Sequence, residues 1–301
     1  MAQHAAKSPE KSMTIQEFEE KRARKWRLRP EFALNTEKEL YGFIREIGAS
    51  TLSSRKNPLY PSLVQAINGS PQHAQAHWHQ HSPYAELMEN FSNRYLHSKK
   101  VFEVNLVQNS LGVVSRGWMT ALYAILGEAN LRRGNGQHSV KRKFSPFELT
   151  VHDVIQEKGP LSKKELRLAL NLWRRSSSRK LEKALSKLWK ALKILRVGYT
   201  RREGTFWEVP HRWDPSLPKE ASSLSREKAA EKLIRTFVET AVATNRRRIS
   251  NAFAGILSPS ETSDALQYLL LKRAIIVDKQ LVLDGKRAFV ADPNRKPPAV
   301  K

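Results

Sequence analysis

The stretch RRSSSRKLEKALSKLWKALK, residues 174–193, carries the clearest structural signal in this sequence. Its leucines recur at spacings of 4, 3 and 4 residues, the pattern of one apolar helix face: Leu181, Leu185, Leu188 and Leu192. Its lysines form a second stripe, about 150° away around the helix: Lys180, Lys183, Lys187 and Lys190. We therefore expect a helix, capped by Ser176–Ser178, with one face in a core and the other presenting cations.

The charge of this helix is one-sided. Glu182 is the only acid among its eight Lys and Arg residues, whereas a face that serves only solubility usually carries both signs. The whole chain has 53 Lys and Arg against 29 Asp and Glu, a net charge of +24. Residues 131–202 hold 20 basic and 5 acidic residues, and so carry +15 of it. A solvated lysine face is the alternative, but this concentration favours a polyanionic partner, chiefly nucleic acid.

Several classes of protein are disfavoured. No run of about 18 apolar residues exists, so we expect no bilayer span. The start, MAQHAAKSPEKSM, lacks a hydrophobic signal core, and no cysteine is present for disulfides or thiol-bound metals. We expect a cytoplasmic, nucleoid-associated protein without cofactor or metal, whose 301 residues form two or three small domains.

The predicted fold is mainly α with small β-wings: a helical N-terminal domain followed by tandem winged helix-turn-helix modules. The clearest linker is RRGNGQHSVKRK, residues 132–143, with two glycines, five cations and no apolar period. The expected parts are a basic N-terminal arm (1–35), the helical domain (36–130), a basic linker (131–143), a first winged-helix module (144–220), a second (221–291) and a disordered tail (292–301).

The N-terminal part carries helix signals. Thr14–Arg24 has the alternating charges of a lead-in helix. Thr36 is expected to cap a helix, with Glu39 completing a capping box and Gly48 at the exit. Two further helices are expected over 62–69 and 115–130, separated by a polar loop.

After the linker, one order of elements occurs twice. A helix (146–157), a Gly-Pro turn, a short helix capped by Ser162 and Glu165, and the basic helix precede two apolar runs, ILRVGYT and TFWEVP. A weaker copy has helices over 225–241, 244–255 and 258–273, and then the short strands AIIVD, QLVLD and RAFVAD. This order predicts a helix-turn-helix with a wing, in two tandem copies.

Phosphate binding requires cations, and twelve residues of these modules are predicted to bind DNA. Those of the first module lie on its second and third helices and at the hairpin tip: Lys163, Lys164, Arg167, Arg179, Lys180, Lys183, Lys187, Arg201 and Arg202. Those of the second module lie at a helix start: Arg246, Arg247 and Arg248. The alternative for Arg201 and Arg202 is an ordinary charged turn. The alternative for Arg246, Arg247 and Arg248 is that they lie on the helix surface without binding phosphate.

Two sets of ring side chains are not expected to bind a ligand. Four histidines share a polar stretch: His73, His77, His79 and His81. They have no acid or cysteine among them and do not share a helix face, so we expect a surface loop rather than a metal site. Four tryptophans of the modules are expected to be core anchors rather than stacking platforms: Trp173, Trp189, Trp207 and Trp213.

Several segments resemble the AlkZ/YcaQ-type winged-helix DNA glycosylases. They are FIREIGAS (43–50), PSLVQAING (61–69), GPLSKKELRLAL (159–170), residues 179–215 with their RWDP sequence, and residues 224–255. The resemblance covers roughly residues 36–291 and is best over 159–291. It implies that tandem winged helices build a scaffold around DNA and that alkylated or crosslinked bases are excised.

The resemblance stops at the catalytic motif. Catalytic members of that family carry a Gln-x-Gln or Gln-x-Asp motif in the N-terminal region, where it positions the hydrolytic water. No such pair occurs near Gly48–Ser70, where Gln65 stands alone. Glu39 and Glu46 lie in the same region, but the sequence assigns a catalytic role to neither.

These observations predict a sequence-tolerant, phosphate-based binder of double-stranded DNA, with a DNA repair glycosylase as the enzymatic version. The alternative is a non-enzymatic winged-helix transcription factor or DNA-architectural protein. No membrane is expected as a partner.

Overall fold

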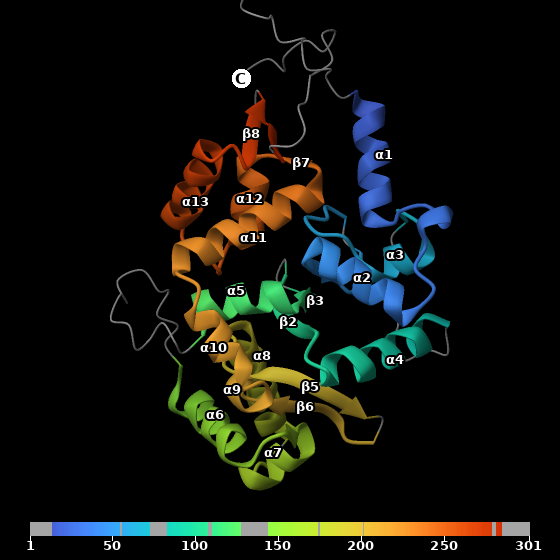
Figure 1. The fold of residues 1–301 in the computed structure, drawn as a ribbon. Coiled ribbons are helices and arrows are strands. Elements are labelled where there is room, and N and C mark those ends of the chain that lie inside the picture. Colours follow the sequence, from blue (N-terminus) through green and yellow to red (C-terminus); the bar gives the residue numbers. More distant parts are fainter. Residues whose placement is uncertain are drawn as a thin grey trace, which may run out of the picture.

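The computed structural model describes residues 14–54, 56–72, 83–107, 110–127, 144–173, 175–200, 202–278 and 281–284. These residues are mostly helical, and their strands pair antiparallel in a six-stranded and a three-stranded sheet (Figure 1). The basic linker, the predicted tail, the four clustered histidines and the RAFVAD strand lie outside the described residues. No helix among those described is long and apolar enough to cross a lipid bilayer.

One order of elements occurs three times: helix, short strand, helix, helix and two-stranded hairpin. The first repeat has α2 (Glu37–Ile47), β1 (Ala49–Thr51), α3 (Leu63–Asn68), α4 (Pro83–His97), β2 (Val101–Val107) and β3 (Ser110–Ser115). The second repeat has α6 (Pro146–Lys158), β4 (Leu161–Ser162), α7 (Lys163–Ala169), α8 (Arg175–Lys190), β5 (Leu195–Thr200) and β6 (Gly204–Glu208). The third repeat has α11 (Arg226–Ala241), β7 (Ala243–Thr244), α12 (Arg246–Phe253), α13 (Pro259–Leu271), β8 (Ile275–Asp278) and β9 (Leu281–Asp284).

The strand pairing repeats as well. In each repeat the short first strand pairs with the last strand, which pairs with the middle one, in the orders β1-β3-β2, β4-β6-β5 and β7-β9-β8. The first two sets join through β2 and β5 into the six-stranded sheet. An ion pair at this junction joins Glu103 to Arg196, with Nη1 and Oε2 3.1 Å apart.

The first repeat departs from the expected helical domain. The predicted helices α2 and α3 are confirmed, including the capping box of Thr36 and Glu39 and the end of α2 at Gly48. Helix α4 was not predicted from the sequence. The prediction is wrong in omitting the three strands. Four apolar side chains of β2 are buried: Val101, Phe102, Val104 and Leu106. A strand formed in this way is stabilised by its cross-strand and packing neighbours rather than by a local signal.

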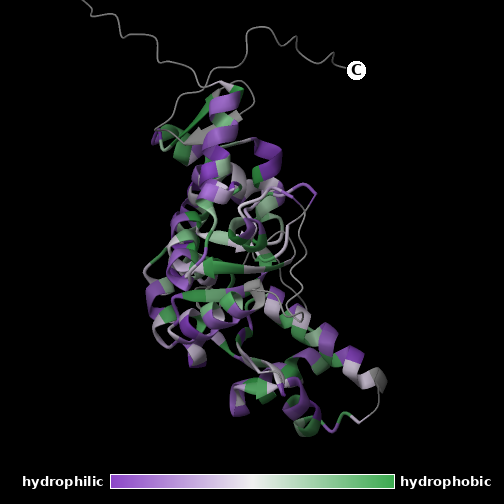
Figure 2. Cartoon of the chain, turned by 90° about the vertical axis from the view of Figure 1, so that its right-hand side faces the viewer, coloured by the Kyte–Doolittle hydropathy of each residue, from purple (hydrophilic) through white to green (hydrophobic). Residues whose placement is uncertain are grey.

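Helices between the repeats build a shared core. These are α5 (Arg116–Leu126), α9 (Pro210–Trp213) and α10 (Ser216–Ser222). Eight residues of α5 are buried, and the helix packs against α10 and α11. In Figure 1 it lies at the middle of the molecule, and Figure 2 shows hydrophobic residues concentrated on the central strands.

The N-terminal segment is tied to the third repeat. Helix α1 (Ile15–Trp26) begins at the cap Thr14, which confirms the predicted lead-in helix, and a short 3-10 turn, η1 (Pro30–Phe32), follows. Trp26 is buried and donates from Nε1 to the carbonyl oxygen of Thr240 at 2.8 Å. Thr240 also donates from Oγ1 to the carbonyl oxygen of Ile47 at 3.0 Å. The third repeat therefore contacts both the N-terminal helix and α2 of the first repeat, which the order of the chain does not indicate.

Candidate nucleic-acid interface

Helix α8 has the two faces that its sequence predicts. Leu181, Leu185 and Leu188 are buried in the core of the second repeat, because residues three and four apart face the same side. The predicted cap is wrong. The helix begins at Arg175, so Ser176–Ser178 lie within its first turn rather than before it.

A shallow depression of about 770 Å³ follows the exposed face of α8. All of its lining residues belong to this one helix: Arg179, Glu182, Lys183, Ser186, Lys187 and Lys190. Four of the six are cations and one is an acid. A single helix thus presents a row of positive charge on a rigid surface, which complements an extended anion.

Helix α6 (Pro146–Lys158) and the segment just before it contact two of the lysines of α8, Lys180 and Lys187. Lys187 lies 2.7 Å from Glu148 and 5.4 Å from the ring centroid of Phe144. Lys180 lies 4.3 Å from the ring centroid of Phe147, a cation–π distance. Burial acts to raise the pKa of Glu148, but its hydrogen bonds with Lys187 and Ser145 lower it, so the carboxylate stays ionised. These contacts restrict the lysines to one side of α8.

Acidic side chains bring α7, α8 and the hairpin tip together. Lys163 forms an ion pair with Glu182 of α8. Lys164 and Arg202 both approach Oε1 of Glu203 at the β5–β6 tip, at 3.6 and 3.5 Å. Arg202 remains highly exposed, and the predicted Arg201 lies outside the described residues. Most predicted cations of the second repeat thus share one surface.

Two of the residues predicted to bind DNA donate hydrogen bonds to backbone carbonyl oxygens. Arg167 donates from Nε to the carbonyl oxygen of Leu172 at 3.2 Å. Arg248 donates to the carbonyl oxygen of Pro58 at 2.5 Å, and its partial burial lowers its pKa. Burial, and then the charge of Arg248, also lower the pKa of Arg22, a neighbour that the sequence did not indicate.

The cations of the third repeat do not join this surface. Arg246 and Arg247 are exposed at the start of α12. Figure 1 shows α12 in the upper part of the molecule and α8 in the lower part. The predicted set therefore divides into two separate groups.

The three repeats allow an internal comparison, because α4, α8 and α13 occupy the same place in the element order. Helix α8 carries six Lys and Arg and one Glu. Helix α4 has one Arg and two Glu, and α13 has no Lys or Arg, one Glu and one Asp. At this place in the element order, a cationic helix is therefore a property of the second repeat and not of the shared architecture.

A sequence comparison identifies the family. Residues 34–254 match the family described as AlkZ related, which covers the first two repeats and the third as far as α12. The chain belongs to the AlkZ-related family. Comparison with curated proteins gives no match, and neither does comparison with solved structures.

The glutamine motif of catalytic relatives has no counterpart among the described residues near Gly48–Ser70. Gln65 of α3 is buried, and its Nε2 donates to the carbonyl oxygen of Pro71 at 2.7 Å. Ser50 of β1 is also buried and donates to the carbonyl oxygen of Pro61 at 3.0 Å. Both polar side chains stabilise local turns in this member of the AlkZ-related family.

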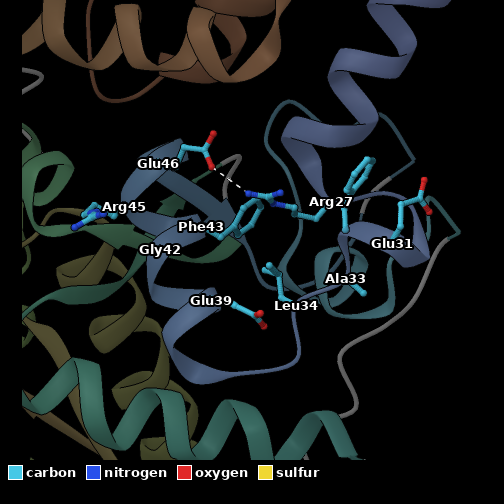
Figure 3. A pocket seen from close by; sticks show the side chains of 10 residues that line it. Arg27, Glu31, Ala33, Leu34, Glu39, Gly42, Phe43, Arg45 and Glu46 are labelled. Atoms are coloured by element: carbon cyan, nitrogen blue, oxygen red, sulfur yellow. Dashed lines mark hydrogen bonds and ion pairs between the residues drawn. The ribbon is translucent and has the colours of Figure 1, made fainter.

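A hollow of about 640 Å³ lies between the end of α1 and helix α2 (Figure 3). Glu46 at its rim lies 2.7 Å from Lys25 and 3.3 Å from Arg27. Glu39 accepts hydrogen bonds from the backbone nitrogens of Asn35 and Thr36 at 2.9 and 3.0 Å, and these lower its pKa. Both carboxylates thus have structural partners.

The tryptophan predictions divide. Trp189 and Trp207 are buried and meet edge to face, with ring centroids 5.3 Å apart, as expected of core anchors. Trp213 is partly buried beside His97. For Trp173 the prediction is wrong, because this side chain is exposed. Among the described residues no cluster of His, Asp and Glu could hold a metal ion.

Proposed function

We propose that this AlkZ-related protein binds duplex DNA through its phosphates, using α8 of the second repeat. The observation that carries the proposal is the internal comparison of α4, α8 and α13, of which α8 alone has a cationic face. Cations that served only to keep the protein soluble would not be concentrated on one of three equivalent helices.

The proposal assigns each repeat to the winged-helix class. The order of helices and strands and the strand order within each sheet are those expected of such modules. In the second repeat α8 would be the recognition helix and the β5–β6 hairpin the wing, with Arg202 at its tip. Lys164 and Arg202, which share Glu203, would then approach the DNA together.

Sequence-tolerant binding is proposed because lysine is the commonest charged side chain on the exposed face of α8. Its exposed face carries Lys and Arg but no Asn or Gln. Lysine contacts phosphate as a point charge, whereas Asn and Gln recognise bases by paired hydrogen bonds. A protein of this kind would prefer no particular sequence.

Replacing Lys180, Lys183 and Lys187 together by alanine is expected to weaken binding to all duplexes by about 100-fold at physiological salt. Each lost phosphate contact removes roughly one unit from the salt slope, which should be about −4 to −5 in the wild type for five neutralised phosphates. Fluorescence anisotropy over a series of salt concentrations measures both quantities.

The matched control removes the same charge elsewhere, by replacing the exposed Lys219, Lys228 and Lys232 with alanine. This triple variant should keep nearly the whole salt slope. Equal losses in the two triple variants would assign binding to net charge and contradict a site on α8. Wild-type affinity that does not change with salt would contradict phosphate binding altogether.

Base excision is the second candidate function, and family membership favours it. Excision requires a base extruded into a pocket and a group that activates water. The test incubates the protein with duplexes carrying N-alkylated purines or an interstrand crosslink, and then cleaves abasic sites with alkali. Protein-dependent strand breaks would support a glycosylase. Intact strands with tight, salt-sensitive binding would place the protein in the non-enzymatic class.

A competition assay separates repair from regulation. A transcription factor should prefer one site by about 10³-fold or more over random duplex. A repair protein should instead prefer damaged or distorted duplex of any sequence.

A further inference from the structure

Trp173, between α7 and α8, leaves 70% of its surface exposed. An indole is among the largest apolar side chains, and leaving it in water forgoes the free energy of burial. The stability of the second repeat therefore gives no reason for a tryptophan at this position.

Hydrogen bonds and packing fix the residue that precedes Trp173. The backbone nitrogen of Leu172 donates to the carbonyl oxygen of Arg167 at 2.8 Å, and its carbonyl oxygen accepts from Nε of Arg167 at 3.2 Å. Leu172 also packs against the core of the second repeat. Since the preceding residue is fixed in three ways, the indole is presented to solvent by a defined backbone.

The third repeat shows that this turn can bury its apolar residues. The equivalent turn, between α12 and α13, contains Ile256 and Leu257, each only 5% exposed. They directly precede Ser258, the cap of α13. The exposed indole is thus a feature of the repeat that has the cationic helix.

The charges near Trp173 define what could cover it. The residue lies two positions before Arg175, and the first turn of α8 holds no acid. The N-terminal end of a helix carries partial positive charge, and Arg179 and Lys183 are exposed further along. A ligand with a flat aromatic face next to negative charge would complement this site, and a nucleobase on its phosphate backbone has both properties.

We propose that Trp173 stacks on an unstacked base of DNA that α8 holds by its phosphates. This inference rests on the proposed function and adds its substrate class, a duplex interrupted by an unpaired base. In an intact duplex each base is covered on both faces by its neighbours. An indole gains stacking area only where a base face is open or a base step is wedged apart.

The test compares two labelled duplexes of identical sequence, one fully paired and one with a single unpaired adenine at its centre. Trp173→Ala is expected to lose about tenfold in affinity for the bulged duplex and about twofold or less for the paired one. Trp173→Phe should keep most of the preference, because a phenyl ring also stacks. The control is Leu271→Ala, which removes another apolar side chain, 76% exposed, from α13 and should leave both affinities unchanged.

The outcomes distinguish this inference from the proposed function. Salt-sensitive binding in which Trp173→Ala weakens both duplexes equally, or neither, would overturn the inference and leave DNA binding by α8 intact. If the wild type bound neither duplex, both would fail. Circular dichroism and thermal unfolding should show all three variants folded, because each altered side chain is exposed.

Discussion

Replacing Arg116 by methionine is expected to lower the free energy of unfolding by about 3 to 5 kcal/mol. Nη1 of Arg116 lies 2.8 Å from Oδ2 of Asp214, whose side chain is only 4% exposed. Without the guanidinium this carboxylate would be buried without its cation, which costs more than the pair itself contributes. Methionine keeps the apolar stem, so packing changes little. Urea unfolding followed by circular dichroism measures the difference.

The contacts of Arg116 explain why one side chain has so large an effect. It also binds Glu220 at 2.8 Å, the hydroxyl of Ser216 at 2.6 Å and the carbonyl oxygen of Lys99 at 2.9 Å. Asp214 belongs to the RWDP sequence that marked the family resemblance. That sequence therefore fastens the segment after the second repeat to α5.

The pH dependence of the free energy of unfolding tests whether the buried carboxylate of Asp214 causes the deficit of Arg116→Met. Burial acts to raise the pKa of Asp214, but hydrogen bonds from Ser216 and Arg116 lower it overall. The stability it contributes is therefore present above the ordinary carboxyl pKa of about 4 and lost as the pH falls through the lowered value. Without Arg116, burial should raise this pKa, so the deficit of the variant should shrink from pH 7 towards about pH 4.

A surface pair serves as the control. Arg235 lies 2.9 Å from Glu239, one turn away on α11, and their side chains are 46% and 36% exposed. Arg235→Met should change the free energy of unfolding by less than about 0.5 kcal/mol. An equal deficit in the two methionine variants, or a deficit in Arg116→Met that does not depend on pH, would contradict the buried-pair explanation.

Local signals allowed much of the fold to be predicted from the sequence. The capping boxes at Thr36 and Ser162 and the cap at Ser225 involve residues three apart, so a short window contains all the interacting groups. The apolar stripe of α8 is likewise a property of one helix. The helix order of the second and third repeats was predictable for these reasons.

Pairing across the chain was not predictable in this way. Strands β4 and β7 have two residues each and exist only by pairing with β6 and β9. The junction of Glu103 with Arg196 joins residues far apart in sequence, as does that of Arg116 with Asp214. The residues around each partner do not indicate which distant residue it will pair with. For this reason the sequence predicted two repeats, whereas the structure has three.

In the candidate site too, the features with a local sequence signal were predictable and those that depend on distant contacts were not. The cationic face of α8 was visible because charge and helical period are local. The exposure of Trp173 was not, because LNLW resembles an ordinary apolar run and only the packing of Leu172 decides which side chain remains outside. The engagement of Arg248 by the carbonyl oxygen of Pro58 has the same non-local origin.

Replacing Gly48 by alanine is expected to destabilise the protein by about 4 kcal/mol. Gly48 ends α2 with φ +79° and ψ −48°, a backbone conformation that costs other residues about 1 to 3 kcal/mol. An added Cβ would lie 2.5 Å from Cδ1 of Trp118 and 2.8 Å from Cγ2 of Thr236. Both neighbours belong to packed helices, α5 and α11, so relief of the clash costs about a further 1 to 3 kcal/mol. The melting temperature should fall by roughly 10 °C.

Gly42, in the middle of the same helix, is the matched control. A Cβ there would meet nothing within 4 Å, so Gly42→Ala should stabilise α2 by about 0.5 to 1 kcal/mol through helix propensity. Two glycine-to-alanine changes six residues apart should thus have opposite signs in one thermal unfolding experiment. A Gly48→Ala variant as stable as the wild type would mean that α2 does not need this close approach to α5 and α11. Below its melting temperature Gly48→Ala should bind DNA as the wild type does, because α8 lies in another repeat.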